Sequence, residues 1–167
     1  EAVDRVVPQL VSDLVASRIT GGDETLWGPD AEEESAKRLG WVEAVSVSRP
    51  MVADIVALRD KLREDGVDHI VLGGMGGSSL APEVITRTYG VELTVLDSTD
   101  PGQVLAALGD RLATTAVVIS SKSGSTVETD SQKRIYEKFF SEAGIDPLER
   151  IIVVTDPGSP LDAAARA

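Results

Sequence analysis

The sequence has no cysteine and only one histidine, His69. The absence of thiols excludes a disulfide scaffold, a zinc–thiolate site and a cysteine nucleophile. A single histidine argues against a histidine-based metal site and against a Ser-His-Asp triad. The lack of cysteine fits a reducing compartment, and we expect a cytoplasmic protein.

Basic residues and long apolar runs are also scarce. Lys and Arg number 16 against 28 Asp and Glu, giving a net charge of −12. Such a chain has no general attraction for nucleic acid or anionic lipid. No apolar run approaches the roughly 18 residues of a membrane span, and EAVDRVVPQL at the N-terminus is not a signal peptide. A small anionic ligand is compatible with this charge only where local backbone dipoles attract it.

The chain of 167 residues is long enough to form its own core as one domain with at most a small appendage. Residues 51–167 alternate apolar strands with helical segments. Strands are expected at HIVLG (69–73), VELTVL (91–96), TAVVIS (115–120) and RIIVVT (150–155). This pattern predicts an α/β domain with a doubly wound parallel sheet and a ligand crevice at the carboxyl ends of its strands. Because such sheets often have five or more strands and the chain does not begin with Met, we expect an excised, truncated piece.

Residues 1–50 predict a helical lead-in before this domain. Residues 1–20 predict one amphipathic helix whose start Pro8 delays. Its apolar stripe comprises Val3, Val7, Leu10, Leu14 and Val15. A second short helix should end at Gly40, with Trp41 as a packing anchor.

The helices of the α/β part carry recognisable start and stop signals. The helix that begins near Met51 should stop at Gly66. Pro82 suits a first helical turn, and Asp100 and Ser159 each precede a proline as N-caps. Ser125 and Glu128 predict a capping box.

The junction after the first strand is rich in glycine, from Gly73 to Ser79. Glycines let backbone approach a ligand closely, and free N–H groups at a helix start favour an anion. The alternative is a tight turn whose glycines serve packing. After the second strand, Asp97 could either meet a ligand hydroxyl or order the turn.

The junction after the third strand is rich in hydroxyls, from Ser120 to Thr126. Hydroxyls, a lysine, a glycine and a helix N-terminus together favour a phosphate cradle. The spacing is not that of a Walker A loop. The alternative is a serine-rich loop that only caps the helix.

Two functions compete on these residues. A dinucleotide-binding domain would use Gly74, Gly76 and Asp97, but Ser79 stands where a third glycine is expected. That hypothesis leaves the hydroxyl-rich junction unexplained. A sugar-phosphate site uses both junctions, one for the sugar and the other for the phosphate, and we favour it.

The two elements GMGGSSLAPEV and SKSGSTVET resemble the sugar isomerase (SIS) domain of the glucose-6-phosphate isomerase family. The residues of these motifs are similar to those of the bacterial branch in which the isomerase can follow a transaldolase. The resemblance covers about residues 36–167, most firmly 70–132. It implies a flavodoxin-like SIS domain over residues 51–167, with residues 1–50 as the lead-in.

The resemblance also implies the substrate-binding residues. They are Gly77, Ser78, Ser121, Lys122, Ser123, Gly124, Ser125 and Thr126. The direct phosphate contacts are expected from Ser121, Ser123, Ser125 and Thr126, with Lys122 acting through its backbone N–H. Many family members have a bulkier residue at position 124, so Gly124 is expected to loosen the loop.

The family's chemistry is the aldose–ketose isomerisation of glucose 6-phosphate and fructose 6-phosphate in glycolysis and gluconeogenesis, without metal or organic cofactor. Its catalytic glutamate, histidine and lysine match no position here, so the chain is expected to carry no catalytic residue. His69 and Glu128 are interpreted as structural. A homodimer, or a fusion to transaldolase, is the expected assembly. The alternative within the same resemblance is a non-catalytic SIS module that senses a phosphosugar.

Overall fold

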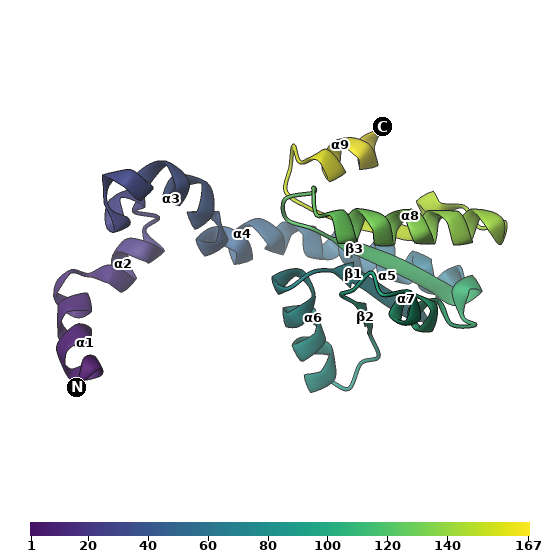
Figure 1. The fold of residues 1–167 in the computed structure, drawn as a ribbon, viewed down its shortest axis with the longest axis horizontal. Helices are drawn as coiled ribbons and strands as arrows, with labels where there is room; N and C mark the ends of the chain where they lie inside the picture. Colours follow the sequence, from purple (N-terminus) through teal and green to yellow (C-terminus); the bar gives the residue numbers. More distant parts are fainter. The chain divides into compact units, whose positions relative to one another are not determined.

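The computed structural model describes residues 1–167, which form two compact units, Glu1–Leu58 and Arg59–Ala167 (Figure 1). The first unit is entirely helical, as predicted. Its helices are α1 (Ala2–Ser12), α2 (Val15–Thr20), α3 (Glu32–Arg38), α4 (Ala44–Ser48) and the first part of α5 (Val52–Glu64). Short 3₁₀ turns connect α2 to α5. Leu39 is the buried residue of this unit, so it has little core of its own.

Residues 1–20 form two helices, and the prediction of a single helix with a late start is wrong. Helix α1 begins at Ala2, with Pro8 inside it, and its first turn begins before the proline. The helix is interrupted at Leu14, which has a φ of 52°. This left-handed conformation is costly for a branched side chain and separates α1 from α2.

Trp41 is 66% exposed, so the prediction that it anchors the packing of the lead-in is wrong. Helix α3 ends at Arg38, before the predicted stop at Gly40, and a 3₁₀ turn continues from Leu39. Within this turn the smaller Leu39 is buried instead of the indole.

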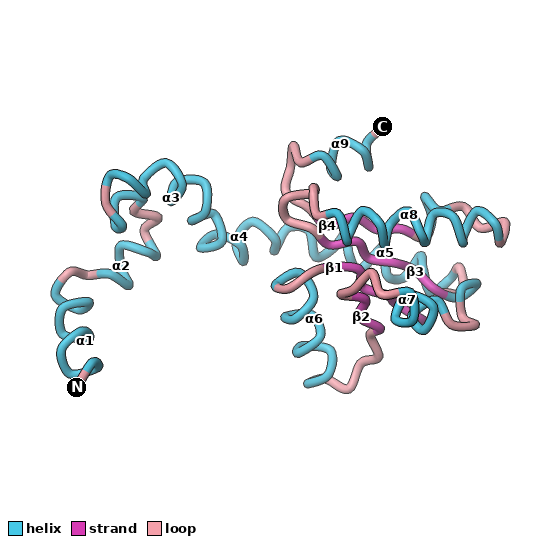
Figure 2. Tube along the Cα trace, in the orientation of Figure 1, coloured by secondary structure: helices cyan, strands magenta, loops and turns pink.

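The second unit is built around a parallel sheet, as predicted, and Figure 2 shows its strands side by side. The strands are β1 (His69–Gly74), β2 (Thr94–Leu96), β3 (Thr115–Ser120) and β4 (Ile151–Val154). The order across the sheet is β2-β1-β3-β4. This is the order of flavodoxin-like doubly wound sheets, which confirms the expected fold class.

Helices cover both faces of the sheet. They are the end of α5, α6 (Gly77–Thr88), α7 (Pro101–Leu108), α8 (Val127–Glu142) and α9 (Pro160–Arg166). On one face, Val71, Val117 and Ile119 pack with Tyr136 and Phe140 of α8 and with residues of α7 and α9. On the other face, Leu62 of α5 packs with Val67 and Ala116. Alternate residues of each strand therefore enter opposite cores.

Most helix signals are confirmed, and two are corrected. Gly66 follows α5 with a φ of 81°, and the side chains of Asp100 and Ser159 cap α7 and α9. Helix α6 begins at Gly77, so Pro82 lies inside the helix and not in its first turn. The N-cap of α8 is Thr126, so the predicted Ser125–Glu128 capping box is wrong.

The predictions for Pro82 and Ser125 are wrong for two different local reasons. Residues 77–81 can already adopt helical dihedrals directly after the glycines, and the hydroxyl of Ser125 donates to Ser123 Oγ within the loop and not to the helix. None of the helices is both long and apolar enough to cross a membrane.

Candidate functional site

The strand order brings the two predicted junctions together. Strand β1 pairs with β3 along its length, and Gly74 stands opposite Ser120 in the register. The chain leaves these neighbouring strands toward helices on opposite faces, because α6 follows β1 and α8 follows β3. This is the topological switch point, where doubly wound sheets bind their ligands.

The glycines after β1 serve different purposes. A Cβ on Gly73 would lie 3.0 Å from both Gln132 Oε1 and Ile119 Cδ1, and one on Gly74 would lie 3.0 Å from Ser120 O. Close packing therefore requires glycine at both positions. Gly76 has a φ of 55°, which permits the sharp turn into α6.

Gly77 and Ser78 are the first two residues of α6. No atom lies within 4 Å of the position that a Cβ on Gly77 would occupy, so backbone at this point is open to an approaching group. Ser78 lies next to Gly74 in the same turn. Both interpretations of the glycine-rich junction therefore apply to different residues of it. Glycines serve packing at its beginning, and the backbone is open to a ligand at its end.

The hydroxyls of residues 121–126 form a network inside the loop. Ser121 Oγ lies 3.1 Å from Thr126 Oγ1 and accepts a hydrogen bond from the backbone N–H of Gly124 at 3.2 Å. Ser123 Oγ accepts from the N–H and the hydroxyl of Ser125, at 3.3 and 3.2 Å. The side chains are therefore held close together, with Ser123 and Ser125 exposed and Ser121 buried.

The electrostatics of this loop differ from those of the whole chain. No acidic residue occurs between Ser121 and Thr126, and the Lys122 side chain is exposed. Helix α8, with 16 residues, begins directly after the loop and directs its positive dipole end toward it. The arrangement can bind a small anion through hydroxyl and backbone donors despite the net charge of −12.

A third segment, the turn between β4 and α9, packs against the loop and was missed in the sequence. The N–H of Ser121 donates to Val154 O at 3.0 Å, and the N–H of Asp156 donates to Lys122 O at 3.3 Å. Thr155 Oγ1 lies 2.8 Å from Ser159 Oγ. The sequence could have indicated this segment, because the turn follows the fourth strand and the carboxyl ends of parallel strands share one edge of the sheet.

Gly124 is where this turn comes closest to the loop. Its φ is 65°, and a Cβ would lie 2.5 Å from Ser159 Oγ and 2.9 Å from Leu161 N. The glycine thus permits close packing between the loop and the start of α9. The expectation that Gly124 loosens the loop does not account for this contact.

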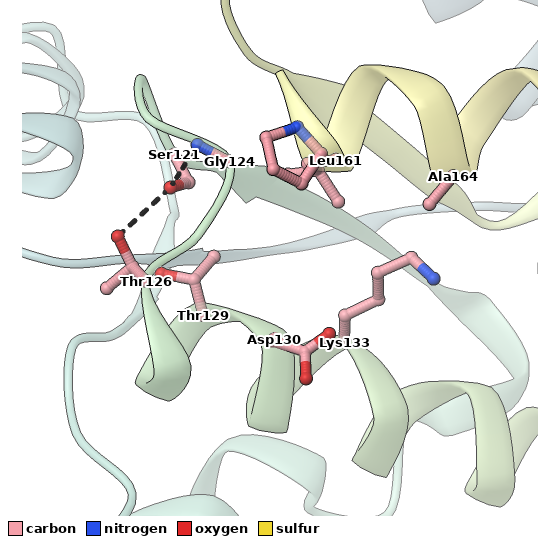
Figure 3. Close-up of a pocket in the computed structure, with 9 residues that line it drawn as sticks. Ser121, Gly124, Thr126, Thr129, Asp130, Lys133, Leu161 and Ala164 are labelled. Carbon is pink, nitrogen blue, oxygen red and sulfur yellow. Dashed lines mark hydrogen bonds between the residues drawn. The ribbon is translucent and has the colours of Figure 1, made fainter.

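A pocket of about 110 Å³ lies beside the loop (Figure 3). Its lining comes from the loop, from α8 and from the start of α9, and comprises Ser121, Gly124, Thr126, Thr129, Asp130, Lys133, Pro160, Leu161 and Ala164. Thr129 and Lys133 were not singled out in the sequence. They follow Thr126 by three and seven residues, which places them on one face of a helix. This spacing could have predicted that they lie beside the loop.

A second, apolar pocket of about 280 Å³ lies on the face of the sheet that carries α6. Ser78 and Ser120 line it together with apolar residues that include Ile70, Leu72 and Val118. Because most of its lining is aliphatic, and its few polar side chains are uncharged hydroxyls, the pocket suits a phosphate less well than the hydroxyl-rich loop does.

His69 lies at the opposite end of β1 from the crevice. Its Nδ1 is 2.9 Å from Thr115 Oγ1 and its Nε2 is 2.7 Å from Thr94 Oγ1, so the ring connects β1 to both neighbouring strands. Burial lowers the pKa of His69, and the positive charge of Arg111 lowers it further. The structural interpretation of His69 is confirmed.

The fold and the loops define a class: a doubly wound α/β domain with a hydroxyl-rich loop and a helix N-terminus at its switch point. No family model matches the chain. A glucose-6-phosphate isomerase of Synechococcus elongatus is 39% identical over 100 residues, which are 55% of this chain and 19% of the relative. The chloroplastic glucose-6-phosphate isomerase 1 of Arabidopsis thaliana is 36% identical over 101 residues, 56% of this chain and 16% of the relative.

A solved structure shows the same fold. The glucose-6-phosphate isomerase of Chlamydia trachomatis superposes with a TM-score of 0.61 at 24% identity, covering 89% of this chain and 29% of that one. The chain spans about a fifth of the length of the curated relatives it matches. These comparisons confirm the resemblance: the chain is homologous to glucose-6-phosphate isomerases over about 100 residues.

Proposed function

We propose that the protein acts as a glucose-6-phosphate isomerase, and that the residues described here form its phosphate-binding part. The single observation that carries the proposal is the hydroxyl-rich loop Ser121–Thr126 at the start of α8, beside the open helix start at Gly77. The reaction is the interconversion of glucose 6-phosphate and fructose 6-phosphate in glycolysis and gluconeogenesis, and a cytoplasmic location is part of the same proposal.

In this proposal residues 51–167 act as an SIS domain and residues 1–50 as a helical lead-in. Ser123, Ser125 and Thr126 donate hydroxyl hydrogen bonds to the phosphate. Ser121, which the resemblance implied as a fourth direct contact, is buried, and we assign it instead the ordering of the loop through Gly124 N and Thr126 Oγ1. Lys122 contributes its backbone N–H group, whereas the N–H of Gly124 bonds Ser121 within the loop and Gly124 serves the site by its close packing against the start of α9. Gly77 and Ser78 contact the sugar from the neighbouring helix start.

In this proposal the residues of the two loops bind the substrate and do not take part in proton transfer. The isomerisation moves a proton between C1 and C2 of the opened sugar, which needs a base within hydrogen-bond reach. No residue of the loops has that role here, and no metal or organic cofactor is invoked. We therefore expect the 167-residue chain to bind the phosphate group without catalysing the reaction. Assembly as a homodimer or behind a transaldolase is part of the same proposal.

A dinucleotide is a weaker candidate for a structural reason. The hydroxyl of Ser79, which stands at the third position of the glycine pattern, is nearly fully buried and donates to Gly76 O at 3.1 Å. This side chain fills the space that the third glycine would leave for close packing.

Titration with glucose 6-phosphate, inorganic phosphate and NAD, followed by backbone amide resonances, tests the proposal. Both phosphate ligands should shift the amides of residues 121–126. Replacing Ser123 and Ser125 by Ala should weaken binding at least about tenfold, because hydrogen bonds to a charged group contribute about 1.5–3 kcal/mol each.

The matched control is Ser141→Ala, which removes a hydroxyl that bonds Glu137 O at 2.7 Å on the same helix. This variant should bind as the unaltered chain does. Shifts at the loop with NAD but not with glucose 6-phosphate would contradict the proposal and favour the dinucleotide alternative.

A further inference from the structure

The inner face of α8 carries buried polar side chains where apolar ones would be expected. Thr129, Gln132 and Tyr136 are at most 2% exposed. Thr129 Oγ1, Gln132 Oε1 and the Tyr136 hydroxyl have no hydrogen-bond partner. An unpaired buried polar atom costs free energy, so each such residue needs a reason beyond stability.

Gln132 is distinguished from the other two by a long-range hydrogen bond. Its Nε2 donates to the backbone oxygen of Ser98 at 3.1 Å. Ser98 lies in the turn between β2 and α7, and its own Oγ accepts from the N–H of Asp100 at 2.9 Å. The carboxamide therefore ties α8 to an ordered turn after the edge strand.

The other side of the Gln132 carboxamide faces the end of β1. The position of a Cβ on Gly73 would be only 3.0 Å from Gln132 Oε1, so the side chain passes directly against the backbone of that strand. Gly73 precedes the junction that contains Gly77 and Ser78. One fully buried side chain thus contacts the end of β1 and the turn that follows β2, while it is anchored on the helix that follows β3.

Helix α8 begins directly after the loop Ser121–Thr126, and Gln132 lies within its second turn. A change in the position of this helix would move the donors of its first turn relative to Gly77 and Ser78. The site extends over two loops that follow different strands. Its geometry therefore depends on contacts that fix α8 against the ends of β1 and β2.

We propose that Gln132 is a positioning residue of the phosphate site: its carboxamide sets the placement of the α8 N-terminus against the ends of β1 and β2. The proposal rests on the proposed function, because it assigns a role in that same site. Gln132 is fully buried and does not contact the ligand. It acts through Ser98 and Gly73.

Two variants of the 167-residue chain separate this role from general stability. Gln132→Leu keeps the volume of the side chain and removes its donor, which leaves Ser98 O without this bond. We expect affinity for glucose 6-phosphate and for inorganic phosphate to fall by about three- to tenfold, in keeping with the loss of one hydrogen bond.

Gln132→Glu supplies a pH-dependent rescue. A protonated carboxyl can donate to Ser98 O, whereas a carboxylate cannot, and burial raises the pKa of a glutamate. The ratio of its dissociation constant to that of the unaltered chain should be near one at about pH 5 and rise with pH. Nearby Tyr136, whose pKa burial raises, stays neutral. The other charged side chains on this part of α8 form ion pairs with each other, Asp130 with Arg134 and Lys133 with Glu137.

Ser131→Ala is the control, because the Ser131 hydroxyl bonds only Val127 O at 2.8 Å on the outer side of α8. It should bind phosphate as the unaltered chain does at every pH. Melting temperatures show whether each variant is folded at the temperature of the titration.

The outcomes are distinct. Binding by the unaltered chain, weaker binding by Gln132→Leu and a ratio for Gln132→Glu that rises with pH support the proposal. Equal affinities of all variants, or a constant ratio for Gln132→Glu, overturn it and leave the proposed function intact. Absence of phosphate binding by the unaltered chain overturns the proposed function and, with it, this role for Gln132.

Discussion

Single glycines show how the two loops of the site are built. Gly73 lets the side chain of Gln132 pass, Gly74 lets β1 approach Ser120, and Gly124 lets the start of α9 approach the loop. Among the glycines of these two loops, Gly76 and Gly124 have a positive φ, of 55° and 65°. Glycine in this region therefore serves packing between segments as much as ligand approach.

Gly124→Ala tests this packing. The added methyl group would overlap Ser159 and the residue would be held in a left-handed conformation, so we expect a loss of about 1–3 kcal/mol in the free energy of unfolding. Chemical denaturation measures the change. Gly40→Ala, where no atom lies within 4 Å of the new Cβ, is the control and should change stability little. If Gly124→Ala were as stable as this control, the turn after β4 would not be held against the loop.

At the scale of the elements, β1 is the centre of the sheet and is fixed at both ends. At its carboxyl end, Gly73 and Gly74 pack against α8 and β3. At its amino end, His69 bonds threonines of β2 and β3. The bonds of His69 suit a neutral ring, and burial lowers its pKa in the folded chain.

This pKa shift has a consequence for stability against pH. The unfolded chain, with a histidine pKa near about 6.5, binds a proton more readily than the folded chain does. The free energy of unfolding contributed by His69 is therefore fully present above that pKa. It decreases as the pH falls toward the lowered pKa of the folded state.

Denaturation midpoints at several pH values between about 7.5 and 5 should reveal this loss. The His69→Gln variant keeps hydrogen-bonding groups and does not titrate, so the stability difference between the two chains should change across this window. The carboxyl groups of Asp23, Asp68 and Asp162, whose pKa values are lowered, lose their contributions only at more acidic pH. A difference independent of pH would refute this account.

At the scale of the whole chain, the two units differ in how much apolar surface they bury. The unit Arg59–Ala167 has two apolar clusters on the faces of its sheet, whereas Glu1–Leu58 has one buried residue, Leu39. Apolar residues of α1, including Val3 and Leu10, are exposed. Local stability follows buried contacts, so it should be concentrated in the sheet.

Amide hydrogen exchange measures this distribution directly. We expect the amides of β1 and β3, such as those of Val71 and Val117, to exchange orders of magnitude more slowly than those of α1 and α2. Comparable protection in α1 and β3 would contradict the prediction and would show that the helical unit is stabilised by contacts other than those within it.

Much of the site could be predicted from the sequence because its signals are local. Apolar runs identified all the strands, and the hydroxyl-rich and glycine-rich stretches identified both loops of the crevice. Local signals also misled. Pro82 and Ser125 are plausible helix starts, yet α6 begins at Gly77, since the N–H groups of Ser79 and Leu80 already donate to Gly76 O. Helix α8 begins at Val127, since the N–H and hydroxyl of Ser125 bond Ser123 within the loop.

Periodicity and the content of glycine and hydroxyl groups depend only on neighbours along the chain, so the α/β class and the polar, anion-favouring character of the loops follow from the sequence. The tertiary structure decided which loops meet. The order β2-β1-β3-β4 places Gly74 opposite Ser120, brings the turn before Ser159 against Gly124, and directs Gln132 toward Ser98 and Gly73. These contacts join residues far apart in sequence, and they arise from the packing of helices on both faces of one sheet.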